Sequence, residues 1–224
     1  MRKGILFYGI ITMLAVGCKT YKPVAKAVAY RGMYSEKPTS LLIMPPINRS
    51  TCVEAKEYFH STLEVPLSEA GYYVIPPFLS MDILKRESAY DAELFLNQPV
   101  NKFGEVFGAD AVLFTIIHSW DKSELISRVT VEVEYIIKST KTNEILYTRK
   151  GKIKLNTGVN TGLGIVANMA ASAINTAMTD YTFVARKCNS YTLADIPRGK
   201  YNAKFGNDST TLAGKKEFTA HISK

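Results

Sequence analysis

The sequence predicts an α/β fold, in which helices pack on one mixed β-sheet. The first observation is a β-α-β start, made of two short apolar runs that each end in two prolines and enclose a helical pattern. The second is a series of three longer segments with strand character, joined by polar turns, which is typical of an antiparallel meander. Together these patterns predict an α/β domain over residues 40–190.

The β-α-β start opens with the apolar run at 41–44, whose length suits a short buried strand. Thr51 and Glu54 have the spacing of a capping box, and apolar residues then recur at helical intervals as far as Gly71, a good C-terminal stop. The run at 72–75 repeats the pattern of the first strand. This order of elements makes a β-α-β unit.

Two helices and the meander follow. Residues 79–86 and 100–107 have helical patterns. Residues 111–120 are continuously apolar, as expected for a central strand covered on both faces. The next two segments alternate apolar and polar residues, which predicts strands at 129–137 and 145–155.

The segment 163–178 is rich in alanine, which predicts a helix that can approach another backbone closely. We expect this helix to pack on the sheet or on a second copy of the chain in a homodimer. Insertion into a membrane is the alternative. The short length of the helix and the presence of Asn168 and Asn175 inside it argue against insertion.

Residues 1–17 have the order of a secretory signal peptide: a basic start, an apolar run and a small residue at the cut. The sequence Ala15-Val16-Gly17-Cys18 resembles the bacterial lipobox, in which the cysteine is lipidated before cleavage. Cys18 is therefore the expected lipid-attachment site and the first residue of the mature chain. Because Lys19 stands where an inner-membrane retention signal has Asp, we expect an outer-membrane anchor that faces the periplasm.

Charge and composition set the expected ends of the domain. The net charge is +8, and many basic residues lie in the stretch 18–39, which we interpret as a basic linker. This linker either lies close to anionic head groups or is solvated without a partner. An envelope tether argues against the other usual partner of a basic chain, nucleic acid. The stretch 191–224 is interpreted as a polar C-terminal tail, loose in its last twenty residues or so because apolar side chains are few.

The sequence contains no recognisable catalytic motif. The three histidines, His60, His118 and His221, do not have the spacing of a metal site. No G-x-S-x-G nucleophile elbow is present, and the glycines before the alanine-rich helix lack the Gly-Lys-Ser/Thr of a phosphate loop. We therefore expect no enzyme activity, no metal and no cofactor.

Cys52 and Cys188 are the two cysteines that remain once Cys18 is lipidated. In an oxidising periplasm they can form a disulfide that closes a loop of more than one hundred residues, worth about 4.7 kcal/mol in the entropy model. Two separate buried thiols are the alternative. The sequence leaves both open.

A candidate partner-binding loop follows the first strand. Asn48 and Arg49 lie just after two prolines, and binding loops gather at the carboxyl ends of strands in open α/β sheets. A stiff loop also loses little entropy on binding. The alternative is that Arg49 only bonds nearby carbonyls or carboxylates.

Four segments carry a family resemblance: "LLIMPPINRST", "YFHSTLEVPLSEAGYYVIPP", "FGADAVLFTIIHSWD" and "VTVEVEYIIKSTKTNEILY". With the lipobox, they resemble a family of bacterial lipoproteins of unknown function that includes a meningococcal lipoprotein antigen. The resemblance covers about Ser40 to Ala185. It implies a fold similar to the N-terminal domain of TolB and to the periplasmic part of curli-type secretion channels.

The resemblance also implies a function. Relatives are associated with curli-channel-type lipoprotein complexes, so we expect a non-enzymatic component or accessory of an outer-membrane assembly, secretion or transport complex. The alternatives are a regulator of a peptidoglycan synthase, which some TolB-like lipoproteins are, and a small-ligand binder. The family supplies no active-site residues to carry over.

Overall fold

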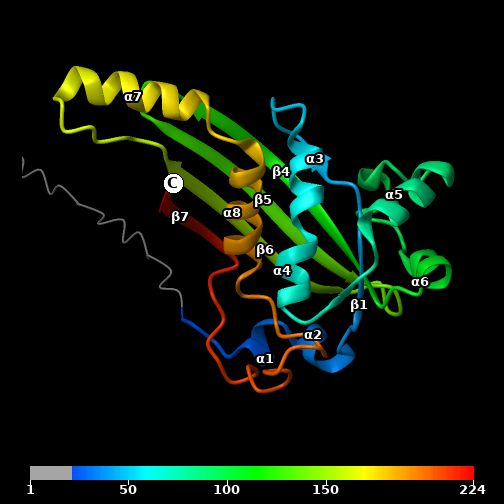
Figure 1. Cartoon of the computed structure of the whole chain (residues 1–224). Helices are drawn as coiled ribbons and strands as arrows, with labels where there is room; N and C mark the ends of the chain where they lie inside the picture. The colour runs from blue at the N-terminus through cyan, green and yellow to red at the C-terminus, as the bar shows by residue number, and fades with distance from the viewer. Residues whose placement is uncertain (1–21) are drawn as a thin grey trace, which may run out of the picture.

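The computed structural model describes residues 22–224, which form one mixed seven-stranded sheet with helices packed on it (Figure 1). The order is β3-β1-β4-β5-β6-β7, and β2 also pairs with β4. The strands are β1 (Ser40–Ile43), β2 (Ile47–Asn48), β3 (Tyr73–Val74), β4 (Ala111–Ser123), β5 (Arg128–Ser139), β6 (Ile145–Asn156) and β7 (Glu217–Ser223). The predicted α/β class is confirmed.

The pairing directions follow the sequence pattern. β4, β5 and β6 form the predicted antiparallel meander. β1, β2 and β3 join the sheet through parallel pairs, as does β7 at the far edge. The helices are α1 (Lys26–Ala29), α2 (Arg31–Glu36), α3 (Ala55–Thr62), α4 (Glu64–Glu69), α5 (Pro77–Arg86), the 3-10 helix η1 (Ala92–Phe95), α6 (Asn101–Phe107), α7 (Ile165–Ala177) and α8 (Tyr181–Leu193).

Alternation along the strands divides the core into two parts. Leu41 and Leu113 belong to the larger cluster, which packs under α3, α4 and α8, whereas their neighbours Leu42 and Val112 belong to the cluster under α5 and α6. Figure 1 shows α3, α4 and α8 across the middle of the long strands and α5 and α6 near β1. Among residues 22–224, no helix covers most of the second face of β5, β6 and β7.

A buried hydrogen-bond network joins α8 to α3 and to the sheet. Asn189 accepts a hydrogen bond from the Tyr135 hydroxyl and donates one to Thr62 Oγ1 at 2.8 Å. All three residues are buried. Because an unpaired polar group costs free energy in such a place, this network fixes how α8 lies on the sheet.

The prediction of a basic linker at 18–39 was wrong for the residues that the structure describes from Ala25 on. Lys26 is buried, with its ammonium 3.6 Å from Asp195 and 3.8 Å from Asp208. Tyr30 donates a 2.5 Å hydrogen bond to Asp195. The segment is held because distant carboxylates neutralise a basic residue that composition alone marks as solvated.

The prediction of a loose C-terminal tail was also wrong. β7 pairs with β6 from Lys150↔Glu217 to Asn156↔Ser223. The segment before β7 forms hydrogen bonds with the beginning of α1, where Lys26 N donates to Thr211 O at 2.8 Å. Backbone hydrogen bonds and buried charges, rather than a run of apolar residues, order this part of the chain.

Three local features also differ from the expectation. The helix predicted after the first strand begins at Ala55 with Glu54 as its N-cap, but no side chain caps it, so the Thr51/Glu54 capping box is absent. The two-residue strand β2 occupies part of what was expected to be a loop. Helix α8 was not predicted separately; its buried face mixes apolar residues with the polar Asn189 and Thr192.

Candidate functional site

The loop proposed for partner binding is held by its own neighbours. Asn48 Nδ2 donates to Cys52 O at 2.7 Å, and its Oδ1 accepts from Ser50 N at 3.0 Å. Arg49 pairs with Glu93 at 2.6 Å. Arg49 therefore pairs with a nearby carboxylate, which was the alternative to partner binding. Both side chains are about half exposed.

Cys52 and Cys188 are both free thiols, so the disulfide is absent from the structure. Cys188 is fully buried, and burial raises the pKa of its thiol far above the usual range. Cys52 lies close to Tyr181 at the start of α8, where it adds to the effect of burial in raising the pKa of the Tyr181 phenol. Seven residues of helix, about 10 Å, separate Tyr181 from Cys188.

Cys18 lies outside the described residues, so its lipidation stays a prediction.

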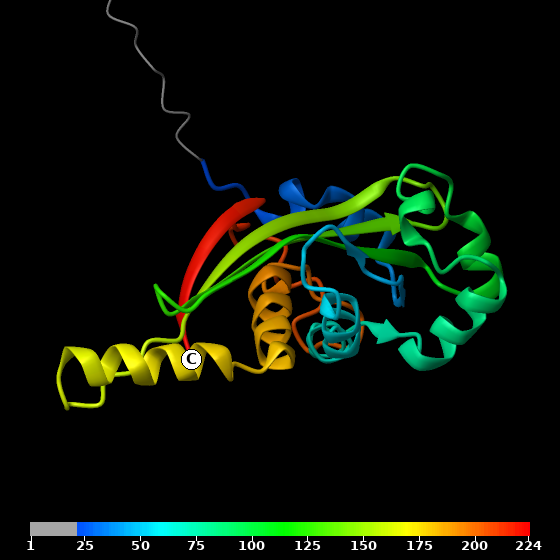
Figure 2. The same cartoon turned by 90° about the horizontal axis from the view of Figure 1, so that it is seen from above.

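The most unusual surface is an apolar arm formed by α7 and the turn between β4 and β5. Figure 2 shows α7 projecting well past α8 and α3, which cover the sheet. Leu125, in the turn, is 96% exposed, and Val166 is 82% exposed. The large exposed apolar side chains of the arm are Leu125, Ile126, Leu163, Ile165, Val166, Met169, Ile174 and Met178.

The polar side of α7 faces the protein. Thr176 and Thr157 share a 2.5 Å hydrogen bond between their hydroxyls, and Ser172 Oγ accepts from Val159 N at 2.7 Å. Asn175 Nδ2 donates to Thr157 O at 2.7 Å. These side chains recur at helical spacing, so one stripe of α7 is fully occupied by hydrogen bonds to the chain segment that leads into the helix.

The apolar side of α7 faces away from the protein. Val166, Ala170, Ile174 and Met178 are four residues apart and all exposed. A surface helix of a globular protein normally has the opposite arrangement, with its apolar stripe toward the core. The inverted arrangement leaves the outer stripe uncovered by the described residues of this chain.

A groove of about 390 Å³ separates α7 from the β4–β5 turn. Leu125 lines one wall, and Ile165 and Met169 line the other. The groove continues the apolar surface from the helix to the tip of the hairpin. Apolar patches of this kind on a protein surface mark interaction sites.

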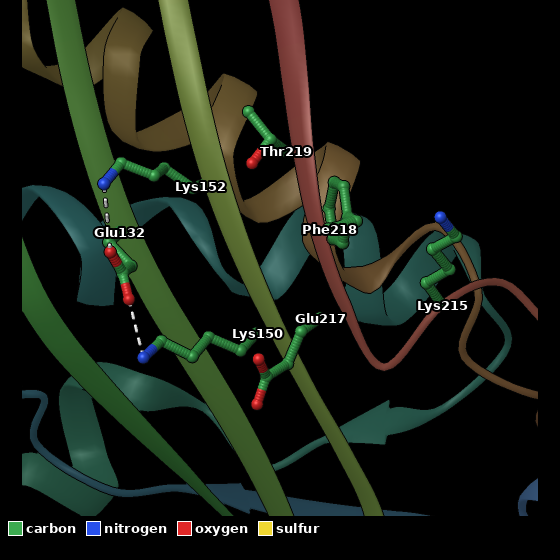
Figure 3. Close-up of a pocket in the computed structure, with 7 residues that line it drawn as sticks. All are labelled: Glu132, Lys150, Lys152, Lys215, Glu217, Phe218 and Thr219. Atoms are coloured by element: carbon green, nitrogen blue, oxygen red, sulfur yellow. Dashed lines mark ion pairs between the residues drawn. The ribbon is translucent and has the colours of Figure 1, made fainter. Parts of the chain in front are cut away.

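A second hollow, the charged groove, lies on the helix-free face of β5, β6 and β7 (Figure 3). Its volume is about 420 Å³, and it is lined by Glu132, Lys150, Lys152, Lys215, Glu217, Phe218 and Thr219. Glu132 is 2.6 Å from the Lys150 ammonium and 3.5 Å from that of Lys152. The hydrogen bond from Lys150 lowers the pKa of Glu132, and the pKa of Lys150 is raised in return.

Histidines do not converge on a site. His60 lies on α3 with its Nε2 buried and unbonded, and burial lowers its pKa. His118 on β4 contacts Glu134 at 2.8 Å, and His221 lies on β7. Within residues 22–224, no three His, Cys, Asp or Glu side chains are grouped so as to hold a metal ion. In the same range, no helix has the length and apolar character needed to cross a bilayer.

Sequence comparison decides the family. The family described as "Putative lipoprotein GNA1162-like" matches residues 28–210, which is most of the chain. This chain belongs to the GNA1162-like lipoprotein family. The match includes α7 and all of α8 and ends at residue 210, whereas the resemblance covered about Ser40 to Ala185.

Individual relatives agree with this membership. The chain is 28% identical over 196 residues to "Putative lipoprotein NMB1124/NMB1162" of Neisseria meningitidis serogroup B, covering 84% of this chain and 89% of that protein. The crystal structure of lipoprotein GNA1162 from Neisseria meningitidis is similar with a TM-score of 0.50 and 26% identity, covering 62% of this chain and 98% of that one.

TolB from Acinetobacter baumannii is also similar, with a TM-score of 0.27 and 12% identity over 63% of this chain and 28% of that one. The family match over residues 28–210 confirms the predicted family.

The alanine-rich pattern predicted α7 but not the direction of its faces. The available signal was the four-residue spacing of the apolar residues, together with the absence of any charged residue from Leu155 to Thr179. An uncharged surface helix with polar residues on one side and apolar residues on the other fits either orientation. The hydrogen-bonding partners in 157–161 decide it, and they are visible only in the structure.

Proposed function

We propose that this GNA1162-like lipoprotein is a lipid-anchored, non-enzymatic component of a protein assembly at the outer membrane, facing the periplasm. Membership in a lipoprotein family supports the anchor, and Cys18 supplies the residue that the anchor needs. Two or three acyl chains on Cys18 would hold the protein permanently, because one chain alone binds only marginally.

The apolar arm is the observation that carries this proposal. Eight large apolar side chains at one end of the molecule are exposed to water. Exposing them is unfavourable by roughly 25 cal/mol for each Å² of apolar surface, and burial against a partner recovers that free energy. A component of a secretion, transport or assembly complex has such a partner.

The charged groove supports the non-enzymatic part of the proposal. Its best-placed carboxylate, Glu132, is neutralised by Lys150 and Lys152 and has a lowered pKa. A general acid or base works best with a pKa near the operating pH, which for a carboxylate requires a raised value. Glu132 is therefore poorly suited to either role.

The distance from the anchor to the fold bears on the alternative, regulation of a peptidoglycan synthase. A regulator that crosses the periplasm needs a long linker. Four residues join Cys18 to Lys22, where the described chain begins, and four residues span at most about 14 Å. The domain would therefore sit close to the membrane, which favours a complex at the outer membrane itself.

The anchor is tested by Cys18→Ser in the full chain. We expect loss of acyl labelling and release of the protein from the membrane fraction. Retention of both labelling and membrane association would contradict the anchor.

The assembly role is tested by comparing membranes that contain the wild-type chain with membranes that contain Val166→Asp/Ile174→Asp. After chemical crosslinking, the wild-type chain should be recovered in a complex larger than one chain, and the arm variant should lose this complex. Thr219→Asp, which adds charge at an exposed position in the charged groove, is the matched control and should keep it. Recovery of single chains only, from wild type and variants alike, would contradict the proposal.

A further inference from the structure

We infer that the occupant of the apolar arm is the arm of a second copy of this chain, with the two α7 helices packed antiparallel around a two-fold axis. The inference rests on the proposed role of the arm as a binding surface and names its partner. A two-fold interface requires a surface that is complementary to itself. Charge, spacing and area each bear on whether α7 has such a surface.

The charge of the arm suits self-association. The 25 residues from Leu155 to Thr179 include no Asp, Glu, Lys or Arg, in a chain of which 21% is charged. Two α7 helices therefore meet without placing like charges together, which is the usual penalty in self-pairing. The turn part of the arm does carry charge, at Glu124. A surface selected for a partner of opposite charge would carry charge of its own.

The spacing of the outer stripe suits an antiparallel pair. Its residues within α7, Val166, Ala170 and Ile174, and the alanines beside them, Ala167 and Ala173, are arranged symmetrically about Ala170. In an antiparallel pair centred on Ala170, Val166 of one helix lies opposite Ile174 of the other, and Ala167 lies opposite Ala173. Alanines then meet at the centre, where they let the backbones approach closely, and the larger Val166 and Ile174 flank them.

The geometry and area of the arm are also adequate. Because α7 projects beyond the body of the protein, two arms can overlap while the two bodies stay apart on opposite sides (Figure 2). Antiparallel helices also place opposite ends of their dipoles together. The eight large exposed side chains of the arm supply apolar surface toward the ~800 Å² that each partner buries in a stable interface.

A lipid surface fits the arm less well. Helices that lie in a membrane interface carry Lys and Arg on their polar face, where these residues meet the head groups. The polar face of α7 carries Ser172, Asn175 and Thr176 instead, and all three are bonded to the protein. The helix therefore lacks both the charge and the free polar face that interfacial binding uses.

The test is disulfide crosslinking of the full lipidated chain in its own membranes. The background is Cys52→Ser, because Cys52 is the half-buried thiol of the domain, whereas Cys188 is buried and unreactive. In this background, Ala170→Cys should form a covalent dimer on mild oxidation, since the two Cα atoms near the axis fall within the roughly 7 Å limit of a disulfide. Thr219→Cys, exposed in the charged groove, is the matched control and should give at least tenfold less dimer.

The direction of packing is tested by co-expressing two differently tagged chains. Val166→Cys in one chain and Ile174→Cys in the other should crosslink to each other more than either does to itself. Adding Val166→Asp and Ile174→Asp to the Ala170→Cys chain should reduce its dimer at least tenfold. The melting temperature of the single chain should stay within about two degrees, because both side chains are exposed there.

Other outcomes would overturn the inference. Crosslinking of Val166→Cys and Ile174→Cys mainly to themselves would mean parallel packing. If the thiol of the Ala170→Cys variant is protected from a water-soluble maleimide but forms no dimer, a different protein or the lipid covers the arm. In that case the inference that a second copy covers the arm is wrong, whereas the proposed function stands if a crosslinked partner is recovered. If the Ala170→Cys thiol reacts with the maleimide as fast as the Thr219→Cys thiol does, the arm is uncovered, and both proposals fail.

Discussion

The charged groove and the apolar arm are two conspicuous surfaces of this protein. They differ in whether other residues of the chain pair with, or cover, the side chains that form them. In the charged groove, Glu132 holds Lys150 and Lys152. In the arm, the polar residues of α7 are satisfied by the protein, and the apolar ones are left in water. The comparison teaches that a hollow lined with charge can be complete by itself, whereas an exposed apolar helix face indicates a missing partner.

The largest effect on stability should come from breaking a buried ion pair, in contrast to the partly exposed pairs of the charged groove. Asp195→Ala removes one of the two carboxylates beside the buried Lys26 and the acceptor of hydrogen bonds from the Tyr30 hydroxyl and Gly214 N. We expect a loss of about 3–5 kcal/mol in the free energy of unfolding, because two donors lose their acceptor and the buried Lys26 keeps only the Asp208 carboxylate. Urea denaturation measures this loss. A loss below about 1 kcal/mol would mean that the chain start is held mainly by its backbone bonds.

The inner and outer sides of α7 should respond differently to substitution. Thr176→Val leaves the buried Thr157 hydroxyl without its 2.5 Å partner, which should cost about 1–3 kcal/mol. Hydrogen exchange of the α7 amides should accelerate accordingly. Val166→Asp on the outer side is the control and, with both variants measured as single chains, should leave the exchange of these amides nearly unchanged. Equal acceleration in both variants would remove the distinction between the two sides.

The smallest effect should come from the charged groove. Glu132→Gln should cost less than about 1 kcal/mol near pH 7, because ion pairs of this exposure contribute little. The pKa of Glu132 is lowered, so its contribution is present above the ordinary Glu value of about 4.3 and is lost as the pH falls through the lower value in the folded state.

The pKa of Lys150 is raised, so its contribution is present below about 10.4 and is lost as the pH rises through its raised value. Wild type and Glu132→Gln should therefore differ in thermal stability between about pH 5 and 10 and converge below about pH 4. A difference that persists at pH 2 would show that Glu132 contributes through packing rather than charge.

The parts of the fold that the sequence predicted depend on local apolar patterns. The alternation in β5 and β6 and the continuous apolar run in β4 were sufficient for the meander. The missed elements, α1, α2 and β7, are held by pairs distant in sequence, such as Lys26 with Asp195. A basic residue bound by a carboxylate 169 positions away has the same local pattern as a solvated one.

The candidate site was predicted only in part, for a similar reason. The helix α7 and its tendency to pack closely follow from its alanines, whereas its orientation depends on Thr157 and Val159 in the preceding segment. The sequence placed Arg49 in the loop after the first strand, but it did not predict the pairing with Glu93, because the two residues are 44 positions apart. Local composition does not contain this information.

The central claim, that the apolar arm is covered in the assembled protein, can be measured most directly by oxidation of its methionines in membranes. Met169 and Met178 are 65% and 77% exposed in the single chain, and exposed methionines are readily oxidised to the sulfoxide. Met81, half-buried on α5 and distant from the arm in sequence, serves as the internal reference. Val166→Asp/Ile174→Asp supplies the uncovered arm for comparison.

In wild-type membranes treated with dilute peroxide, we expect Met169 and Met178 to oxidise several times more slowly than in membranes containing the arm variant, while Met81 oxidises at the same rate in both. Mass spectrometry of the peptides gives the three rates in one experiment. Equal rates for Met169 and Met178 in wild type and variant would contradict the account, because the arm would then be open to water in the cell envelope.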